Sequence, residues 1–319
     1  MGWDLIGHAW AVALLRRQMQ RGSLHHAYLF SGPEGVGRRR LAMAFAQALL
    51  CESPPEPGET CGACRGCRQV PQEAYPDLHM VARSEDKQGL AVDQIRDLQR
   101  QLALAPLAGS RRVAVLLDVD RASLGAANAL LKTLEEPPPR VILLLTAVDV
   151  EQMPATIVSR CESLLLRPVA TGEIAAELQR LGASSEEART WAQQSAGRPE
   201  WGRALMDDPE FRQRLAEHAT AYHEVLSADL GRRFALADSW KDDTQLEERL
   251  SVWISLAGEN LRELTRASGE GEADHDELGR VAQGRRTMDA LIRTLDGLRH
   301  NVNTRLALEG MMLELPRSP

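Results

Sequence analysis

The stretch Ser31-Gly-Pro-Glu-Gly-Val-Gly-Arg-Arg39 decides the fold class, because it lies between an apolar run and a helix-like run. The apolar run is His26-Ala-Tyr-Leu-Phe30, and the helix-like run is Leu41-Ala-Met-Ala-Phe-Ala-Gln-Ala-Leu-Leu50. Strand, glycine-rich turn and helix form the context of a phosphate-binding loop, in which backbone N–H groups and the helix N-terminus bind an anion. The sequence therefore predicts the frame of a nucleotide site.

The chemical residues of this loop depart from the motif G-x-x-x-x-G-K-[ST]. Gly32, Gly35 and Gly37 fit the frame, but Arg38 and Arg39 stand where the motif has Lys and Ser/Thr. An arginine is a planar fork and does not simply replace the compact lysine ammonium, and it cannot ligate Mg²⁺. We therefore expect a degenerate loop that binds no nucleotide.

Strand and helix patterns alternate over the first half of the chain. Apolar runs at 113–117 and 141–145 are typical of buried parallel strands, and shorter strands are predicted at 77–81 and 163–166. The pattern predicts an α/β fold with a parallel sheet covered on both faces by helices. The helices are expected at 3–22, 39–51, 91–104 and 126–135; after Pro168 only helical patterns follow, at 172–181, 185–195 and from about 209 onward, with a polar loop at 267–275.

Composition narrows the class of protein. The 319 residues are 44% hydrophobic and 26% charged, with a net charge of −7, which argues against a surface covered in DNA-binding charge. No stretch reaches the roughly 18 apolar residues of a membrane helix, and no secretory leader is recognisable. We expect a cytoplasmic protein without membrane contact, whose five cysteines are metal ligands or buried thiols.

Four cysteines form the pattern C-x9-C-x2-C-x2-C. Thiolates at this spacing suit a structural tetrahedral zinc ion, and four ligands leave no open position for catalysis. An iron–sulfur cluster is one alternative, although its common spacings differ. A redox C-x-x-C pair is another, although the cluster does not lie at a thioredoxin-like helix start. The predicted zinc ligands are Cys51, Cys61, Cys64 and Cys67, whereas Cys161 is interpreted as a small buried residue.

A central block carries a family resemblance. Ala129-Leu-Leu-Lys-Thr-Leu-Glu-Glu-Pro-Pro138 and the later Ser159-Arg-Cys161 closely resemble the AAA+ clamp-loader subunits of bacterial DNA polymerase III, and so do the cysteine cluster and Asn301-Val-Asn-Thr-Arg-Leu-Ala-Leu-Glu309. The resemblance implies an AAA+ domain at 1–167 with a zinc insert at 51–67. It also implies a small helical lid domain at 168–207 and an all-helical collar domain for oligomerisation at 208–319.

The departures from the family pattern agree with one another. The family's metal-organising Asp and catalytic Glu fall on Leu117-Asp118, or on Asp118-Val119 after a shift of one residue. The polar sensor falls at Ala147 or Val148, and the sensor arginine of the lid falls on Glu200. Phosphate, metal, attacking water and γ-phosphate sensing would all be affected. The chain thus resembles the branch of the family that does not hydrolyse ATP.

Arg160 of the Ser-Arg-Cys motif is the intact functional residue. In the family this arginine acts as a trans arginine finger on the ATP site of a neighbouring subunit; the alternative is a surface arginine in a local ion pair. The resemblance implies a structural (stator) subunit in a hetero-pentameric ring with gamma/tau-type ATPase subunits and a delta subunit. That ring would load the sliding clamp onto primed DNA as part of a DNA polymerase holoenzyme.

Two other functions stay open at this stage. The first is an ATPase clamp-loader subunit that binds nucleotide through its variant loop, with Arg38 in place of the lysine. The second is a zinc-dependent DNA-binding module, for which Arg65 and Arg68 near the cysteines are the only basic residues at hand.

Overall fold

A computed structural model describes residues 3–83, 89–267, 275–299 and 302–316. The chain divides into two compact units, Met1–Met206 and Asp207–Pro319. The three-domain division expected from the sequence stays a prediction. None of the described helices combines the length and the apolar character needed to cross a membrane.

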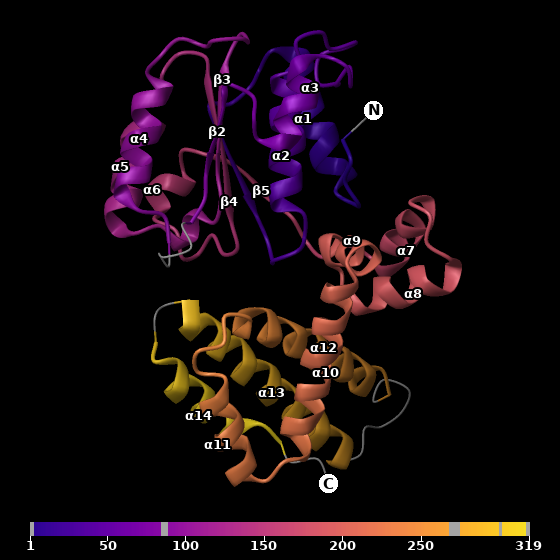
Figure 1. Ribbon diagram of the computed structural model, residues 1–319. Coiled ribbons are helices and arrows are strands. Elements are labelled where there is room, and N and C mark those ends of the chain that lie inside the picture. Colours follow the sequence, from indigo (N-terminus) through magenta and orange to yellow (C-terminus); the bar gives the residue numbers. More distant parts are fainter. Residues whose placement is uncertain (1–2, 84–88, 268–274, 300–301, 317–319) are drawn as a thin grey trace. The chain divides into compact units, whose positions relative to one another are not determined.

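The first unit is built on a five-stranded sheet with the order β2-β3-β4-β1-β5 (Figure 1). All neighbouring strands pair in parallel, with Ala27 opposite Leu143 and Val113 opposite Ile142. The three central strands are buried along their whole length, which explains their continuous apolar sequences. The strands are β1 (Ala27–Ser31), β2 (Leu78–Val81), β3 (Arg112–Leu116), β4 (Val141–Ala147) and β5 (Glu162–Leu165).

Helices cover both faces of this sheet (Figure 1), which confirms the predicted α/β fold class with a parallel sheet between two helical layers. Leu15 and Phe45 from one layer pack on Tyr28 and Phe30, whereas Leu98 and Leu130 from the other layer pack on the opposite face. The first layer holds α1 (Ala9–Arg21), α2 (Arg38–Leu49) and α3 (Arg65–Gln69), and the second holds α4 (Val92–Leu102), α5 (Leu124–Glu135) and α6 (Ala155–Val158).

The helix expected at 3–22 begins only at Ala9, so the first third of that prediction was wrong. Gly7 and His8 have left-handed backbone angles, with φ of 75° and 57°, which end any helical path through residues 3–8. Ile6 instead inserts into a small core with Ile174 and Leu178. That core belongs to the helices α7 (Thr171–Arg180), α8 (Ser185–Gln194) and α9 (Pro199–Asp207).

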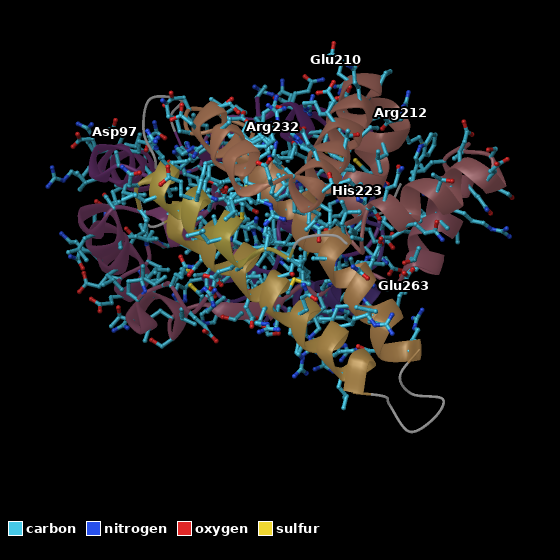
Figure 2. All side chains as sticks on the ribbon, turned by 90° about the horizontal axis from the view of Figure 1, so that it is seen from below. Asp97, Glu210, Arg212, His223, Arg232 and Glu263 are labelled. Atoms are coloured by element: carbon cyan, nitrogen blue, oxygen red, sulfur yellow. The ribbon has the colours of Figure 1, made fainter. Side chains whose placement is uncertain are left out.

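Among the described residues of the second unit, all regular secondary structure is helical. Its buried Arg233 is fully satisfied by backbone carbonyls, among them Val225 at 2.8 Å and Leu315 at 2.8 Å, so this charge fastens the segment around Leu315 to the helices. Glu210 and Arg232 lie on its exposed surface (Figure 2). The helices are α10 (Pro209–Ser227), α11 (Leu230–Ser239), α12 (Leu246–Ala267), α13 (His275–Arg299) and α14 (Thr304–Glu314); the expected polar loop falls on residues 268–274, outside the described residues.

Candidate functional site

A depression of about 590 Å³ lies where β1, β3 and β4 end in the first unit. We call it the loop pocket. Ligands of open parallel sheets bind at this edge, outside the carboxyl ends of the strands. The predicted loop residues Gly35, Gly37, Arg38 and Arg39 line it, together with Glu34, Arg40, Met43, Pro71, Glu73, Leu117, Asp118, Thr146, Glu200 and Trp201.

The loop backbone needs its glycines. Gly32 has φ of 140°, and a Cβ atom there would meet the carbonyl oxygen of Leu166 at 2.2 Å. Gly35 has φ of 75°, and its Cβ would meet the Trp201 ring at 2.6 Å. The glycine pattern is therefore maintained by backbone geometry and by close contact with α9, whether or not a phosphate binds.

Each of the three arginines that begin α2 pairs with a carboxylate of the same chain. Arg38 Nη1 donates to Asp118 Oδ1 at 3.0 Å, and the Arg38 side chain is only 10% exposed. Arg39 pairs with Glu73. The Nε–H of Arg40 is shared between the two carboxylate oxygens of Glu200, at 2.8 and 2.9 Å. The positive charge of the loop is thus neutralised internally.

Asp118 follows β3, the position onto which the sequence alignment placed one member of the family's acidic pair. Its backbone is left-handed, with φ of 50°, and its N–H donates to the Thr146 hydroxyl at 2.9 Å. With Arg38 on its carboxylate, Asp118 holds the end of β3 to α2 and β4. In an active nucleotide site a carboxylate at this position helps to hold the Mg²⁺ ion. Here the carboxylate is paired with an arginine.

Sequence reasoning missed Thr146. It expected the sensor position at Ala147 or Val148, but Thr146 is the polar side chain that lines the pocket from β4, whereas neither of the other two is among the lining residues. The sequence did contain a signal for this residue, because Thr146 is the polar residue that directly follows the apolar run at 141–145. Its hydroxyl is already used by Asp118.

Asp120 was also missed; it lies two residues after Asp118 and is not among the residues that line the pocket. Its Oδ2 accepts the N–H groups of Val148 and Asp149 at 3.0 and 3.3 Å. Burial is the main cause that raises the pKa of this carboxyl, and the nearby Asp118 charge adds to it. The role that the contacts support is to position the turn after β4.

Helix α9 lies directly on the loop. The Glu200 N–H donates to the Gly35 carbonyl at 3.0 Å, and the Arg198 guanidinium stacks 4.2 Å above the Trp201 ring. Asp4 adds a pair with Arg203 at 2.6 Å. Glu200 therefore serves here as an anchor for α9 on the loop, in the place where the family alignment puts the sensor arginine.

We expect Gly35→Ala to loosen this attachment by about 2 to 4 kcal/mol, because it combines a left-handed backbone with a clash against a rigid ring. The matched control is Gly172→Ala in α7, where nothing lies within 4 Å of the new Cβ. The control should be neutral or stabilising by up to about 1 kcal/mol. Hydrogen exchange of the α9 amides measures both effects, and unchanged α9 protection in Gly35→Ala would contradict the contact.

Arg160 lies between α6 and β5 and is not among the residues that line the loop pocket of its own chain. Its Nη2 is 2.8 Å from Glu135 Oε1, and its Nη1 donates to the Thr156 carbonyl at 2.8 Å. The side chains of Arg160 and Glu135 are 35% and 51% exposed. Burial raises the pKa of the adjacent Cys161 thiol to about 12, which disfavours the reactive thiolate. The residue is partly buried, not fully buried as the sequence predicted.

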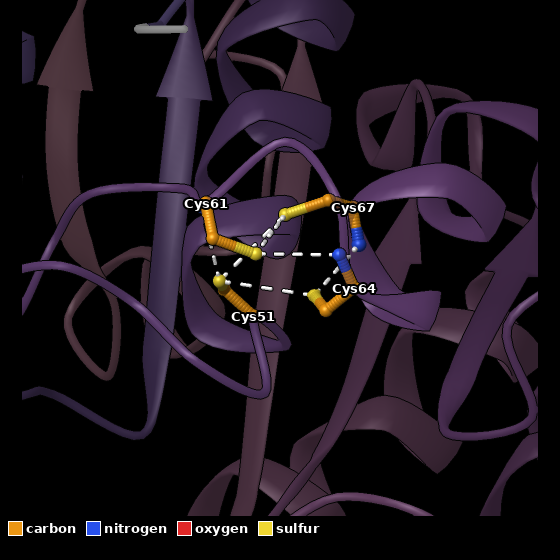
Figure 3. A group of neighbouring side chains, drawn as sticks. All are labelled: Cys51, Cys61, Cys64 and Cys67. Atoms are coloured by element: carbon orange, nitrogen blue, oxygen red, sulfur yellow. Dashed lines mark hydrogen bonds between the residues drawn. The ribbon is translucent and has the colours of Figure 1, made fainter.

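The structure brings the four predicted metal-ligating cysteines together (Figure 3). All ligand atoms lie within 4.8 Å of one another, and Sγ–Sγ distances are 3.6 Å for Cys51–Cys67, 3.8 Å for Cys61–Cys67 and 3.9 Å for Cys51–Cys64. A tetrahedron with metal–sulfur bonds of about 2.3 Å has edges of about 3.8 Å. The cluster therefore has the dimensions of a tetrahedral metal site.

The surroundings of these sulfurs suit thiolate ligands. Backbone N–H groups donate to sulfur from Cys64 to Cys61, from Cys67 to Cys64 and from Cys61 to Cys51, at 3.3 to 3.4 Å. Such donors lower the pKa of Cys61 to about 6, whereas burial raises the pKa of Cys67 to about 12. The donor set fits a bound metal cation, which would stabilise the thiolates together.

Comparison with known proteins places this geometry in a family. Residues 7–170 match the family described as DNA polymerase III, delta subunit. The DNA polymerase III subunit delta′ of Bacillus subtilis is 31% identical over 249 residues, covering 76% of this chain and 74% of that protein. The subunit tau of the same organism is 33% identical over 178 residues, covering 56% of this chain.

The chain spans only 31% of the length of that tau subunit. Among solved structures, a DNA polymerase III gamma-subunit-related protein from Thermotoga maritima aligns over 95% of this chain and 97% of its own length, with 17% identity and a TM-score of 0.49. The family match and the delta′ relative carry the assignment: the chain belongs to the DNA polymerase III, delta subunit family.

Proposed function

We propose that the chain is a delta-prime-type stator subunit of a cytoplasmic clamp loader and does not hydrolyse ATP. In this proposal it joins a hetero-pentameric ring with gamma/tau-type ATPase subunits and a delta subunit, through an oligomerisation domain at 208–319. The ring loads the sliding clamp onto primed DNA. The observation that carries the proposal is the internal neutralisation of Arg38, Arg39 and Arg40 in the loop pocket.

A nucleotide would have to break this network before it could bind. The triphosphate needs cationic partners and a Mg²⁺ ion held by a hydroxyl and a carboxylate. Here the hydroxyl position holds Arg39, and Asp118 is paired with the nearly buried Arg38. Separating that pair leaves a poorly solvated charge, which is unfavourable when one partner is largely desolvated. Arg40 and Glu200 meanwhile fasten α9 on the loop, so α9 is held there without a ligand.

Arg160 is proposed as the residue that acts on a neighbour. Its pair with Glu135 is partly exposed, and exposed ion pairs contribute only about 0 to 1 kcal/mol. The long arginine side chain can therefore leave Glu135 at small cost and reach the phosphates of an adjacent ATP. In the same proposal the four cysteines hold a structural zinc ion, which joins the end of α2 to α3 and takes no part in chemistry.

We expect Glu135→Gln to have little effect. Loss of the exposed pair should change the free energy of unfolding by less than about 1 kcal/mol, and the reconstituted loader should keep its ATPase within about twofold. Urea unfolding and steady-state ATPase assays measure the two quantities. A large loss of ATPase would instead mean that Glu135 is needed to aim Arg160.

The test of the proposed function compares the isolated chain with a reconstituted loader. The isolated chain is expected to hydrolyse ATP no faster than the Arg38→Ala variant, whereas a loader reconstituted with wild-type chain should lose activity when Arg160 is replaced. Mg²⁺-dependent turnover by the isolated wild-type chain that Arg38→Ala removes would contradict the stator role and support an ATPase with a variant loop.

A further inference from the structure

A second depression lies at the opposite edge of the same sheet, where the strands begin. Its volume is about 410 Å³. We call it the amino-end pocket. The lining residues are Leu24, His25, His26, Ser110, Arg111, Pro137, Pro138, Pro139, Arg140, Val141 and Ile142.

Each of the three central strands is preceded by a basic residue in this pocket. His26 comes directly before β1, Arg111 before β3 and Arg140 before β4. These strands are neighbours in the order β3-β4-β1, and they run parallel. Parallel pairing therefore gathers three basic side chains, separated by up to 114 residues in sequence, at one sheet edge.

The positive charge of this pocket is not compensated within the described part of the chain. None of the lining residues carries a carboxylate. Arg111 and Arg140 form neither an ion pair nor a side-chain hydrogen bond with the residues that the structure describes. This contrasts with the loop pocket, where every arginine of the first turn of α2 has its own carboxylate.

Two of these side chains are also poorly solvated. Arg111 is half-buried, and burial lowers the pKa of its guanidinium. The Nε2 atom of His26 is buried without a hydrogen-bond partner, and the ring of His25 lies 4.3 Å from the ring of His26. Burial, and next to it the neighbouring His25, lower the pKa of His26, although the Leu134 backbone carbonyl acts in the opposite direction. A bound anion would stabilise both groups, because it would supply a hydrogen-bond and charge partner to the partly desolvated Arg111 guanidinium and to the unpartnered Nε2 atom of His26.

We propose that the amino-end pocket binds a small phosphate-type oxyanion, such as inorganic phosphate or pyrophosphate, between His26, Arg111 and Arg140. Arginine forks bind the oxygens of such an anion with charge-assisted hydrogen bonds, and the two permanent charges match a dianion. The ring nitrogen of His26 and the Ser110 hydroxyl supply further polar partners. The three prolines offer no N–H group, so specificity rests on these side chains.

The test uses the full, metal-loaded chain titrated with inorganic phosphate at constant ionic strength. Histidine side-chain NMR follows the ring of His26, assigned with the His26→Gln variant. We expect a saturable shift with a dissociation constant of about 1 mM or below. Arg111→Gln should weaken binding at least about tenfold. Arg189→Gln, which removes an equal charge from the exposed face of α8, should leave it unchanged.

Three outcomes would overturn the proposal. The His26 ring shows no saturable response, Arg189→Gln weakens binding as much as Arg111→Gln, or the phosphate affinity measured by calorimetry is retained in both Arg111→Gln and His26→Gln. The last result would place the anion elsewhere, for example at the loop pocket. Circular dichroism establishes that each variant is folded; if Arg111→Gln is not, Arg140→Gln takes its place with the same expected loss.

Discussion

The Arg160→Ala chain, reconstituted with its proposed ATPase partners, is expected to lose hydrolysis at the one ATP site that Arg160 is proposed to complete, while the loader still assembles. A trans-acting arginine stabilises the charge that develops on the transferred phosphoryl group, and its loss slows hydrolysis by roughly 10³- to 10⁵-fold at that site. Because the proposed loader has several ATP sites, the steady-state ATPase rate should fall only by the fraction that the affected site contributes. Single-turnover hydrolysis of labelled ATP resolves that share as a missing fast phase.

Two variants control this experiment. Arg189→Ala removes an exposed arginine from α8 and should leave the fast phase intact. Arg160→Lys keeps the charge but replaces the planar fork by a compact ammonium, so it should restore only part of the rate. A full fast phase in an assembled Arg160→Ala loader would contradict the assignment and would leave Arg160 as a surface arginine paired with Glu135.

Loss of the four-cysteine cluster, the proposed zinc site, is the second large effect. Cys67 is the most buried of the four cysteines, and its Sγ lies 3.6 to 3.8 Å from those of Cys51 and Cys61. We expect Cys67→Ala to abolish zinc binding and to destabilise the segment between α2 and α3 by more than about 4 kcal/mol, the size typical of a lost metal site. Zinc analysis and hydrogen exchange over residues 51–69 measure the two consequences.

Cys161→Ala is the matched control, because it removes a partly buried thiol that lies outside the cluster. It should retain about one zinc per chain and cost about 1 kcal/mol for the lost apolar contact. A wild-type chain with no zinc, or a zinc content that Cys67→Ala leaves unchanged, would contradict the metal assignment. Binding of iron with visible absorbance would favour an iron–sulfur cluster.

Much of the fold could be predicted from local sequence. The continuous apolar runs before Ser31 and at 113–117 and 141–145 became the three buried central strands, because a strand covered on both faces needs apolar residues throughout. The spacing of the cysteines likewise predicted their convergence, since C-x2-C pairs place neighbouring ligands within reach. In both cases the physical constraint acts over a few consecutive residues.

The pairing of charges could not be predicted in this way. Arg38 meets Asp118 across 80 positions and Arg40 meets Glu200 across 160, so their partners depend on the sheet order and on the path of α9. Comparison with the family pattern predicted that Glu200 replaces the sensor arginine. It could not predict that Glu200 anchors α9 on the loop. The same limit explains residues 3–8, where tertiary contact of Ile6 overrides helical periodicity.

The two edges of the sheet therefore differ in whether their basic residues have carboxylate partners. At the carboxyl ends of the strands, three consecutive arginines are each neutralised by the chain itself. At the amino ends, Arg111 and Arg140 have no such partner among the described residues. The small phosphate-type oxyanion that we propose would therefore bind at the edge opposite the loop that the sequence motif marks.

The central claim is that this chain does not use nucleotide, and equilibrium binding of labelled ATP to the purified chain, with and without Mg²⁺, tests it most directly. The ion pairs of Arg38, Arg39 and Arg40 predict that the loop pocket shows no saturable Mg²⁺-dependent binding. Tight binding that requires Mg²⁺ and that Arg38→Ala removes would contradict the account, because the loop would then bind nucleotide despite its internal ion pairs.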